Sequence, residues 1–317
     1  MSEMVKQKTQ WKGVVMLMLT ALIWGTSFVA QSVGMDSVGA FTFNGIRTLI
    51  GAVVLLPFIL IRDALKSRTM TAEQKMQRKA VDKKTVLYGG ILGVVLCLAS
   101  NFQQFAFEYS TSGKIAFITA LYMFFVPLFG LLLKKRIPAL TWVCVVAGFV
   151  GLYFLSIGPG GLGNINRGDL RALICSIFYA VHILLIEKFA PEVDGIKLSC
   201  VQYVVAGVIT CILMFIFETP QMSAILSAAV PLLYSGVMSC GVAYTFQIIG
   251  QKYTEATVAS LIMCMESVFA VLAGALILHE VLSGREILGC VIMFVAIVVS
   301  ELSGFITVKI KSKHNAN

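Results

Sequence analysis

Two stretches decide the fold of this chain: residues 99–110 read ASNFQQFAFEYS, and residues 243–254 read AYTFQIIGQKYT. They align at a constant spacing of 144 positions, and each carries a glutamine, Gln103 or Gln247, at the matching place. A polar identity inside apolar runs is unusual. The repetition indicates two copies of one structural unit.

The alignment continues without a gap over residues 99–156 and 243–300. Each copy of the full pattern holds five apolar runs. Because five is odd, the second copy must enter the bilayer from the opposite side. Inverted repeats are a common build of secondary transporters, in which the substrate site lies near the midplane between the halves.

The composition predicts an all-α integral membrane protein. The chain is 58% hydrophobic and 13% charged, whereas about a quarter of a soluble domain is charged. Runs of about 20 apolar residues, enough to span the bilayer core, recur along the whole length, and the short alternating segments of a β-barrel are absent. We predict ten transmembrane helices, arranged as two inverted five-helix repeats, near 12–33, 38–61, 86–107, 113–133, 139–157, 169–189, 197–217, 230–250, 255–277 and 285–307.

The distribution of basic residues predicts the orientation. If the N-terminus lies inside, most of the 25 Lys and Arg fall in cytoplasmic segments, and only Lys114, Arg167, Arg171 and Arg285 fall outside. This is the positive-inside bias of membrane proteins. We therefore expect a multi-pass protein of the cell membrane with both termini cytoplasmic, and the net charge of +9 does not indicate a nucleic-acid partner.

The domain boundaries follow from a run of helix-breaking residues. Residues 1–158 form the first predicted repeat, the Gly/Pro-rich stretch 159–166 is the linker, and residues 167–317 form the second repeat with a basic tail. Asp169 is placed to cap the first helix after the linker. The basic polar segment 62–85 is expected to be a long cytoplasmic loop.

Glu266 is the acid predicted to lie deepest in the membrane, near the centre of the ninth helix. A carboxylate at this depth costs several kcal/mol unless it is paired, hydrated or protonated. It either faces a cavity and meets a substrate amine or a proton, or it makes one interhelical hydrogen bond as a protonated acid. Its repeat partner is Tyr122, which is also polar and central.

Arg47 lies about a third of the way into the second helix and keeps its charge at any physiological pH. It needs a partner, a cavity or the interface. The candidate partners are a substrate carboxylate, Glu108 or a backbone carbonyl. The aligned residue in the second half is Gln202, so a site built from both halves would be asymmetric.

The first and sixth helices present matched polar pairs. Trp24 aligns with Tyr179, and Ser27 aligns with His182 three residues further on, so each pair shares one face of its helix. The aromatic residues are candidates for lining a substrate site. His182 is either a proton relay or a satisfied interhelical hydrogen-bond donor.

The matched glutamines complete the candidate site. Gln103 and Gln247 either line a hydrated path or bridge helices by hydrogen bonds. Pro127 is expected to interrupt the fourth helix and free a carbonyl at depth, either as a hinge or as a harmless kink. We predict a central cavity approached by Trp24, Gln103, Tyr122, Tyr179, Gln247 and Glu266, with Ser27, Arg47 and His182 as further substrate-binding candidates.

Several short motifs carry a resemblance to a known family. They are Trp24-Gly25-Thr26-Ser27-Phe28, Arg47-Thr48-Leu49-Ile50-Gly51, Gly168-Asp169-Leu170-Arg171, Gly241-Val242-Ala243-Tyr244, Glu266-Ser267-Val268-Phe269 and Leu278-His279-Glu280. The chain resembles the EamA-type drug/metabolite transporters from about residue 12 to 305. The resemblance implies two EamA domains, ten helices and movement of small metabolites by alternating access.

Other classes of protein fit the sequence less well. The three histidines form no metal-binding pattern, and neither a nucleophile elbow nor a phosphate-binding loop is present. We therefore expect no enzymatic activity and no cofactor, and a monomer in the lipid bilayer whose partners are a small-molecule substrate and, as an open alternative, protons. A channel and a non-transporting scaffold or receptor are the alternative functions.

Overall fold

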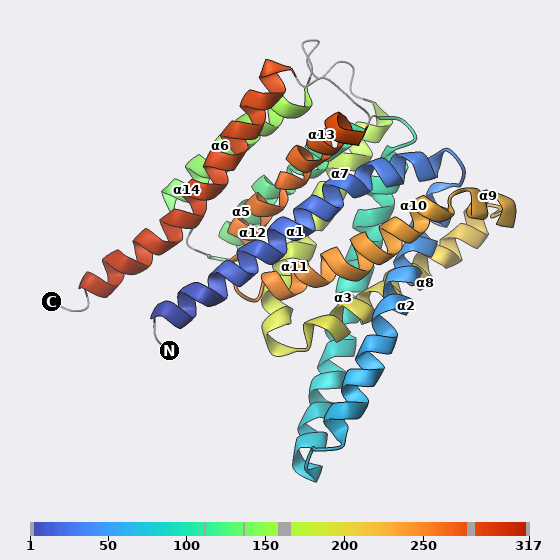
Figure 1. Ribbon diagram of the computed structural model, residues 1–317, viewed down its shortest axis with the longest axis horizontal. Helices are drawn as coiled ribbons and strands as arrows, with labels where there is room; N and C mark the ends of the chain where they lie inside the picture. Colours follow the sequence, from blue (N-terminus) through green and yellow to red (C-terminus); the bar gives the residue numbers. More distant parts are fainter. Residues whose placement is uncertain (1–2, 111, 136, 158–165, 278–282, 315–317) are drawn as a thin grey trace.

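The structure is a computed structural model, and it describes residues 3–110, 112–135, 137–157, 166–277 and 283–314. Every regular element within these ranges is a helix (Figure 1). The first half holds α1 (Glu3–Met35), α2 (Ala40–Ser67), α3 (Ala72–Ala106), α4 (Ser112–Thr119), α5 (Tyr122–Leu132) and α6 (Ala139–Ser156). The second half holds α7 (Arg167–Phe189), η1 (Ala190–Glu192), α8 (Gly195–Phe217), α9 (Met222–Ser227), α10 (Ala229–Tyr234), the π-helix η2 (Ser235–Ala243), α11 (Tyr244–Gly250), α12 (Ala256–Met263), α13 (Met265–Ile277) and α14 (Gly284–His314).

Helical residues occupy each of the ten ranges predicted from the apolar runs. In the described part of the chain, eight helical segments are long and apolar enough to cross a membrane by length and composition. The apolar helix Ala139–Phe154 is shorter than these eight. Long apolar helices in this number define an integral membrane protein.

The basic segment 62–85 is a helical hairpin, so the prediction of a long loop is wrong. α2 continues to Ser67 and α3 begins at Ala72, which leaves a turn of four residues. Thr71 caps α3 in a capping box with Gln74. The hairpin projects well beyond the rest of the bundle (Figure 1), and strong helix formers such as Lys, Glu, Gln and Ala favour the extension of both helices.

Two membrane helices are broken near their centres, at matching positions. The residues Ala120 and Leu121 separate α4 from α5, and Cys264 separates α12 from α13. At the spacing of 144 positions, the two short helices α4 and α12 correspond residue for residue. Pro127 lies inside α5, which continues past it to Leu132, so the proline does not lie at the break in this helix. The other broken helix has no proline at the matching place, so proline does not explain the breaks.

Small residues bring pairs of helices into close contact. A Cβ atom built on Gly93 of α3 would lie 2.7 Å from Cβ of Val205 on α8. A Cβ atom on Gly151 of α6 would lie 2.8 Å from a backbone oxygen of Gly289 on α14. Backbones can approach this closely only where the side chain is absent, as is common between membrane helices. The pair formed by α6 and α14 lies at one edge of the bundle in Figure 1 and packs on α4, α12 and α13.

Asn166, not Asp169, is the N-cap of α7. The Asn166 side chain accepts from the backbone N–H of Asp169 at 3.0 Å, and the Asp169 carboxylate accepts from the backbone N–H of Asn166 at 2.9 Å. Asp169 also forms an ion pair with Lys114 at 2.6 Å. The reciprocal capping box fixes the start of α7, and the ion pair with Lys114 places it beside the start of α4.

Candidate functional site

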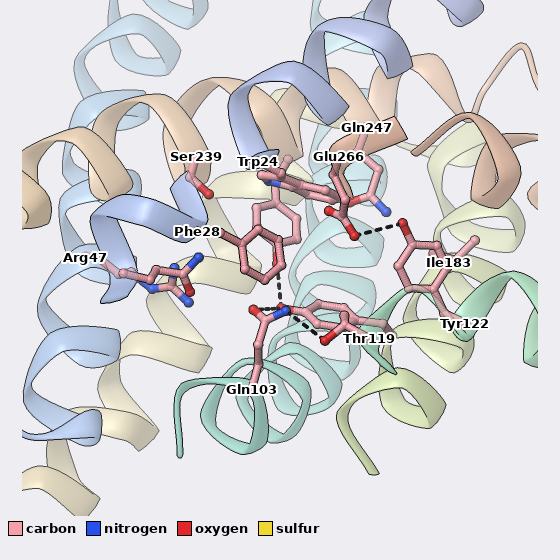
Figure 2. A pocket seen from close by; sticks show the side chains of 13 residues that line it. Trp24, Phe28, Arg47, Gln103, Thr119, Tyr122, Ile183, Ser239, Gln247 and Glu266 are labelled. Carbon is pink, nitrogen blue, oxygen red and sulfur yellow. Dashed lines mark hydrogen bonds between the residues drawn. The ribbon is translucent and has the colours of Figure 1, made fainter. Parts of the chain in front are cut away.

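A cavity lies at the centre of the molecule, between helices of both halves (Figure 2). Its free volume is about 30 Å³, which is room for small molecules of the size of water. The lining comes from α1, α2, α3, α4 and α5 in the first half and from α7, η2, α11 and α13 in the second. The lining residues are Trp24, Phe28, Gln31, Arg47, Gln103, Thr119, Tyr122, Tyr179, Ile183, Ser239, Tyr244, Gln247 and Glu266.

Glu266 lies in the first turn of α13 and is 3% exposed. Its Oε1 accepts a hydrogen bond from the Tyr122 hydroxyl at 3.2 Å, which Figure 2 draws as a dashed line. Tyr122 is the first residue of α5, so the bond joins the two broken helices just after their breaks. Among the described residues, no Lys or Arg lies within ion-pair distance of Glu266. A buried carboxylate in this setting is suited to bind a proton or a substrate cation.

Arg47 lies on the cavity wall and is held by an asparagine. Its Nε donates to Oδ1 of Asn44 at 2.9 Å, and its guanidinium lies 5.7 Å from the ring centre of Phe43. The Asn44 amide donates in turn to Asn101 on α3 at 2.9 Å. Glu108, a candidate partner from the sequence, pairs instead with Arg171, so that assignment is wrong. The described residues offer Arg47 no carboxylate partner, and its planar fork is suited to a carboxylate ligand.

Aromatic and amide side chains form a continuous wall between α1, α3, α7 and α11. The Tyr244 hydroxyl donates to the Tyr179 hydroxyl at 3.1 Å, and Tyr179 donates to Oε1 of Gln103 at 3.3 Å. The Gln103 amide donates to Thr119 at 3.4 Å. The Trp24 ring packs on Tyr244 with centroids 4.6 Å apart. This wall offers a substrate aromatic faces and polar edges together.

Three polar atoms of the cavity lining have no hydrogen-bond partner among the described residues. They are Nε1 of Trp24, a donor, and Oε1 of Gln31 and of Gln247, both acceptors. Because buried polar groups are nearly always paired in folded proteins, an unpaired donor and acceptor on one cavity indicate places where a ligand or water can bond.

Seven of the nine predicted site residues line the cavity, including all six that were expected to approach it. Ser27 and His182 do not. Ser27 is fully buried and lies 3.5 Å from the Ser235 hydroxyl. His182 is fully buried too, with its Nε2 bonded to Gln202 at 3.0 Å. Whether the seven bind substrate stays a prediction.

The sequence reasoning did not select six of the lining residues: Phe28, Gln31, Thr119, Ile183, Ser239 and Tyr244. Gln31 had a usable signal, because it is polar, lies in an apolar run and is one turn past Ser27. Ser239 had none, since the π-helix η2 turns its residues by an angle that helical periodicity does not predict. The motif residues His279 and Glu280 and most of the linker 159–166 lie outside the described residues.

Asp194, between α7 and α8, ties the two halves together on one side of the bundle. Its Oδ1 accepts from the backbone N–H groups of Ile196 and Lys197 at the start of α8, and its Oδ2 pairs with Arg62 of α2 at 2.7 Å. Burial raises its pKa, but the Lys197 N–H and the Arg62 guanidinium outweigh burial and lower it below the ordinary value. The carboxylate is therefore charged at neutral pH.

Comparison with known proteins agrees with this architecture. The model of the EamA-like transporter family matches residues 11–157 and again residues 166–302. Together with the long apolar helices, this defines a multi-pass membrane protein of the transporter class. The chain belongs to the EamA-like transporter family.

Several relatives support the assignment over most of the chain. An uncharacterized transporter of Archaeoglobus fulgidus is 27% identical and covers 90% of this chain and 84% of its own length. The uncharacterized inner membrane transporter YedA of Escherichia coli is 24% identical, covering 90% and 89%. A solved crystal structure at 18% identity superposes with a TM-score of 0.72 and covers 92% of this chain and 96% of that one, which establishes a shared fold.

Proposed function

We propose that this protein is a secondary transporter that moves a small metabolite, an amino acid or a related solute, across the cell membrane by alternating access. The observation that carries the proposal is the hydrogen bond between Tyr122 and Glu266 in a cavity lined from both halves. These two residues are partners at the spacing of 144 positions, so the contact lies where two copies of one unit meet.

The proposal includes two inverted repeats of five helices that cross the membrane ten times. A second hydrogen bond supports this arrangement. The Cys264 thiol donates to the carbonyl of Ala120 at 3.5 Å, and these two residues are also 144 sequence positions apart. Equivalent positions contact each other only near an axis that relates two copies. The packing of α2 on α8 and of α6 on α14 fits the same axis, because each is a pair of equivalent helices.

The charges of the cavity favour a substrate that carries opposite charges. Arg47 on α2 would bind a carboxylate, and Glu266 on α13 would bind an amine or exchange a proton. In Figure 2, Arg47 and Glu266 are well separated, with Phe28 and Trp24 between them in this view. The aromatic wall would hold the apolar part of the same molecule.

Movement is needed because the cavity of about 30 Å³ is too small for a metabolite. The breaks between α4 and α5 and between α12 and α13 are the places where the backbone can bend, since broken helices line the sites of many transporters. Rocking of one half against the other would open the cavity to each side in turn.

Transport of a library of metabolites tests the proposal. Solutes that raise the melting temperature of the purified protein identify binders, and these are then tested in proteoliposomes. A carrier gives saturable uptake that is accelerated by unlabelled solute on the opposite side. A channel gives flux without such counterflow, and a scaffold or receptor gives no flux; either result refutes the proposal.

The orientation is tested separately by cysteine labelling. Ser37 follows α1 and Thr69 lies in the turn of the α2–α3 hairpin, and both are exposed. With cytoplasmic termini, a membrane-impermeant reagent added to whole cells reaches Ser37→Cys and leaves Thr69→Cys unlabelled. The reverse pattern refutes the orientation and leaves the transport proposal untouched.

A further inference from the structure

A second concave surface lies on the outside of the bundle, between α1, α13 and α14. This groove has a volume of about 450 Å³ and is lined by apolar side chains alone. Its long wall is α1 from Trp11 to Leu22, and α14 faces it with Phe294 and Val298. These side chains are about half exposed, for example 53% for Val15 and 54% for Phe294, so no helix of the described chain covers them.

The groove has the length of one leaflet of a bilayer. Residues 11–22 of α1 rise about 16 Å at 1.5 Å per residue, and half of the hydrocarbon core is about 15 Å. Trp11 marks the outer end, which suits a tryptophan at the membrane interface. The deep end is closed by Met265 and Phe269 of α13, close to the level where α1 and α13 touch at Gly25. An extended acyl chain fits these dimensions.

The outer end of the groove carries positive charge. Lys12 follows Trp11 and is exposed. Basic residues next to a membrane helix attract anionic lipid head groups.

We infer that this groove binds an anionic phospholipid, with one acyl chain between α1 and α14 and the head group beside Lys12. Placing the lipid in the cytoplasmic leaflet rests on the orientation proposed above. Binding of the lipid itself does not depend on orientation or transport. Because Met265 precedes Glu266, the bound chain would contact the helix that carries the cavity carboxylate.

Quenching of Trp11 fluorescence by brominated lipid tests this inference. The chain has three tryptophans, so Trp24→Phe and Trp142→Phe leave Trp11 as the single reporter. The protein is reconstituted in phosphatidylcholine with a minor, equal fraction of brominated phosphatidylglycerol or brominated phosphatidylcholine. One lysine near the surface should enrich the anionic lipid roughly fivefold, so phosphatidylglycerol should quench more strongly at the same fraction.

Matched variants separate the groove from the general surface. Lys12→Gln should remove the preference for phosphatidylglycerol, and Lys79→Gln on the α2–α3 hairpin should keep it. Val15→Phe fills the groove and should reduce the excess quenching, whereas Val53→Phe, on the exposed face of α2, should not.

Equal quenching by the two lipids overturns the inference. A dimer seen by light scattering that Val15→Phe dissociates also overturns it, in favour of a second copy of the chain in the groove. If the single-tryptophan protein does not fold, the wild-type melting temperature decides: phosphatidylglycerol should raise it above the value in phosphatidylcholine, and an equal value refutes the site. A protein that prefers the anionic lipid yet transports nothing supports this site while refuting the proposed transport.

Discussion

Replacing Glu266 with glutamine removes the negative charge from the cavity and keeps its shape. The amide oxygen can still accept the hydrogen bond that Tyr122 donates at 3.2 Å. Since no Lys or Arg pairs with this carboxylate among the described residues, the variant loses no ion pair. We expect its melting temperature to equal or exceed that of the wild type, because an amide is less costly to bury than a carboxylate.

Transport by the Glu266→Gln variant should fall strongly, although its stability is kept. A hydrogen bond to a charged group contributes about 1.5–3 kcal/mol. If Glu266 holds a substrate amine or a coupled proton, its loss therefore lowers transport by about 10- to 150-fold. The milder change Tyr122→Phe leaves the carboxylate in place and removes one hydrogen bond. It should lower transport by only about 2- to 10-fold, for 0.5–1.5 kcal/mol.

The assay is solute uptake into proteoliposomes over a range of external pH. Glu255→Gln is the matched control, because Glu255 is an exposed acid at the start of α12 in the same membrane segment. The control should keep both the rate and the pH profile. Wild-type uptake with an unchanged pH profile in Glu266→Gln would refute the reasoning and leave Glu266 as a packing residue.

Three further variants test the site and the packing. Arg47→Lys keeps the positive charge but loses the planar guanidinium that can bind a carboxylate with two hydrogen bonds. The KM for a carboxylate substrate should rise about tenfold, which corresponds to about 1.4 kcal/mol. An unchanged KM in uptake assays excludes such a bidentate contact. Gly93→Leu places a side chain 2.7 Å from Val205 and should destabilise by about 1–3 kcal/mol in thermal melts, whereas Gly90→Leu, which meets nothing within 4 Å, should not. Asp194→Asn can still cap α8 but loses the ion pair with Arg62, and should cost roughly 0.5–1 kcal/mol at neutral pH. The pKa of Asp194 is lowered in the folded state, so this stabilisation is present above the unfolded pKa of about 4 and is lost as the pH falls through the folded pKa. The melting temperatures of wild type and variant should therefore converge in acid. A difference in melting temperature that stays constant with pH contradicts this role of Asp194.

The sequence predicted the helices because hydrophobic thickness constrains them strongly. The predicted range 197–217 differs from α8, Gly195–Phe217, by two residues at one end. The hairpin of α2 and α3 was missed, because polar residues beyond the membrane surface end the apolar pattern without ending the helix. Apolar runs locate membrane crossings and say little about where a helix stops in water.

The matched polar residues predicted a central cavity. They did not predict which other residues line it. Gln103 and Gln247 stand out because polar residues at membrane depth are rare. Phe28 and Ile183 could not be recognised, because apolar residues that line a cavity resemble those that face lipid. The breaks at Ala120 and Cys264 were not predicted either. They arise where the two broken helices contact each other, at the bond between Cys264 and Ala120, and a contact across 144 residues has no local signal.

Alternating access of the central cavity is the claim that one labelling measurement tests most directly. Thr119 lines the cavity on α4 and is 2% exposed, so Thr119→Cys, in a chain whose eight native cysteines are replaced, reports on its opening. We expect a membrane-impermeant thiol reagent to label this cysteine from either side of the membrane, and a transported solute to slow labelling from both sides. Labelling from one side only, with no effect of any transported solute, would contradict the account.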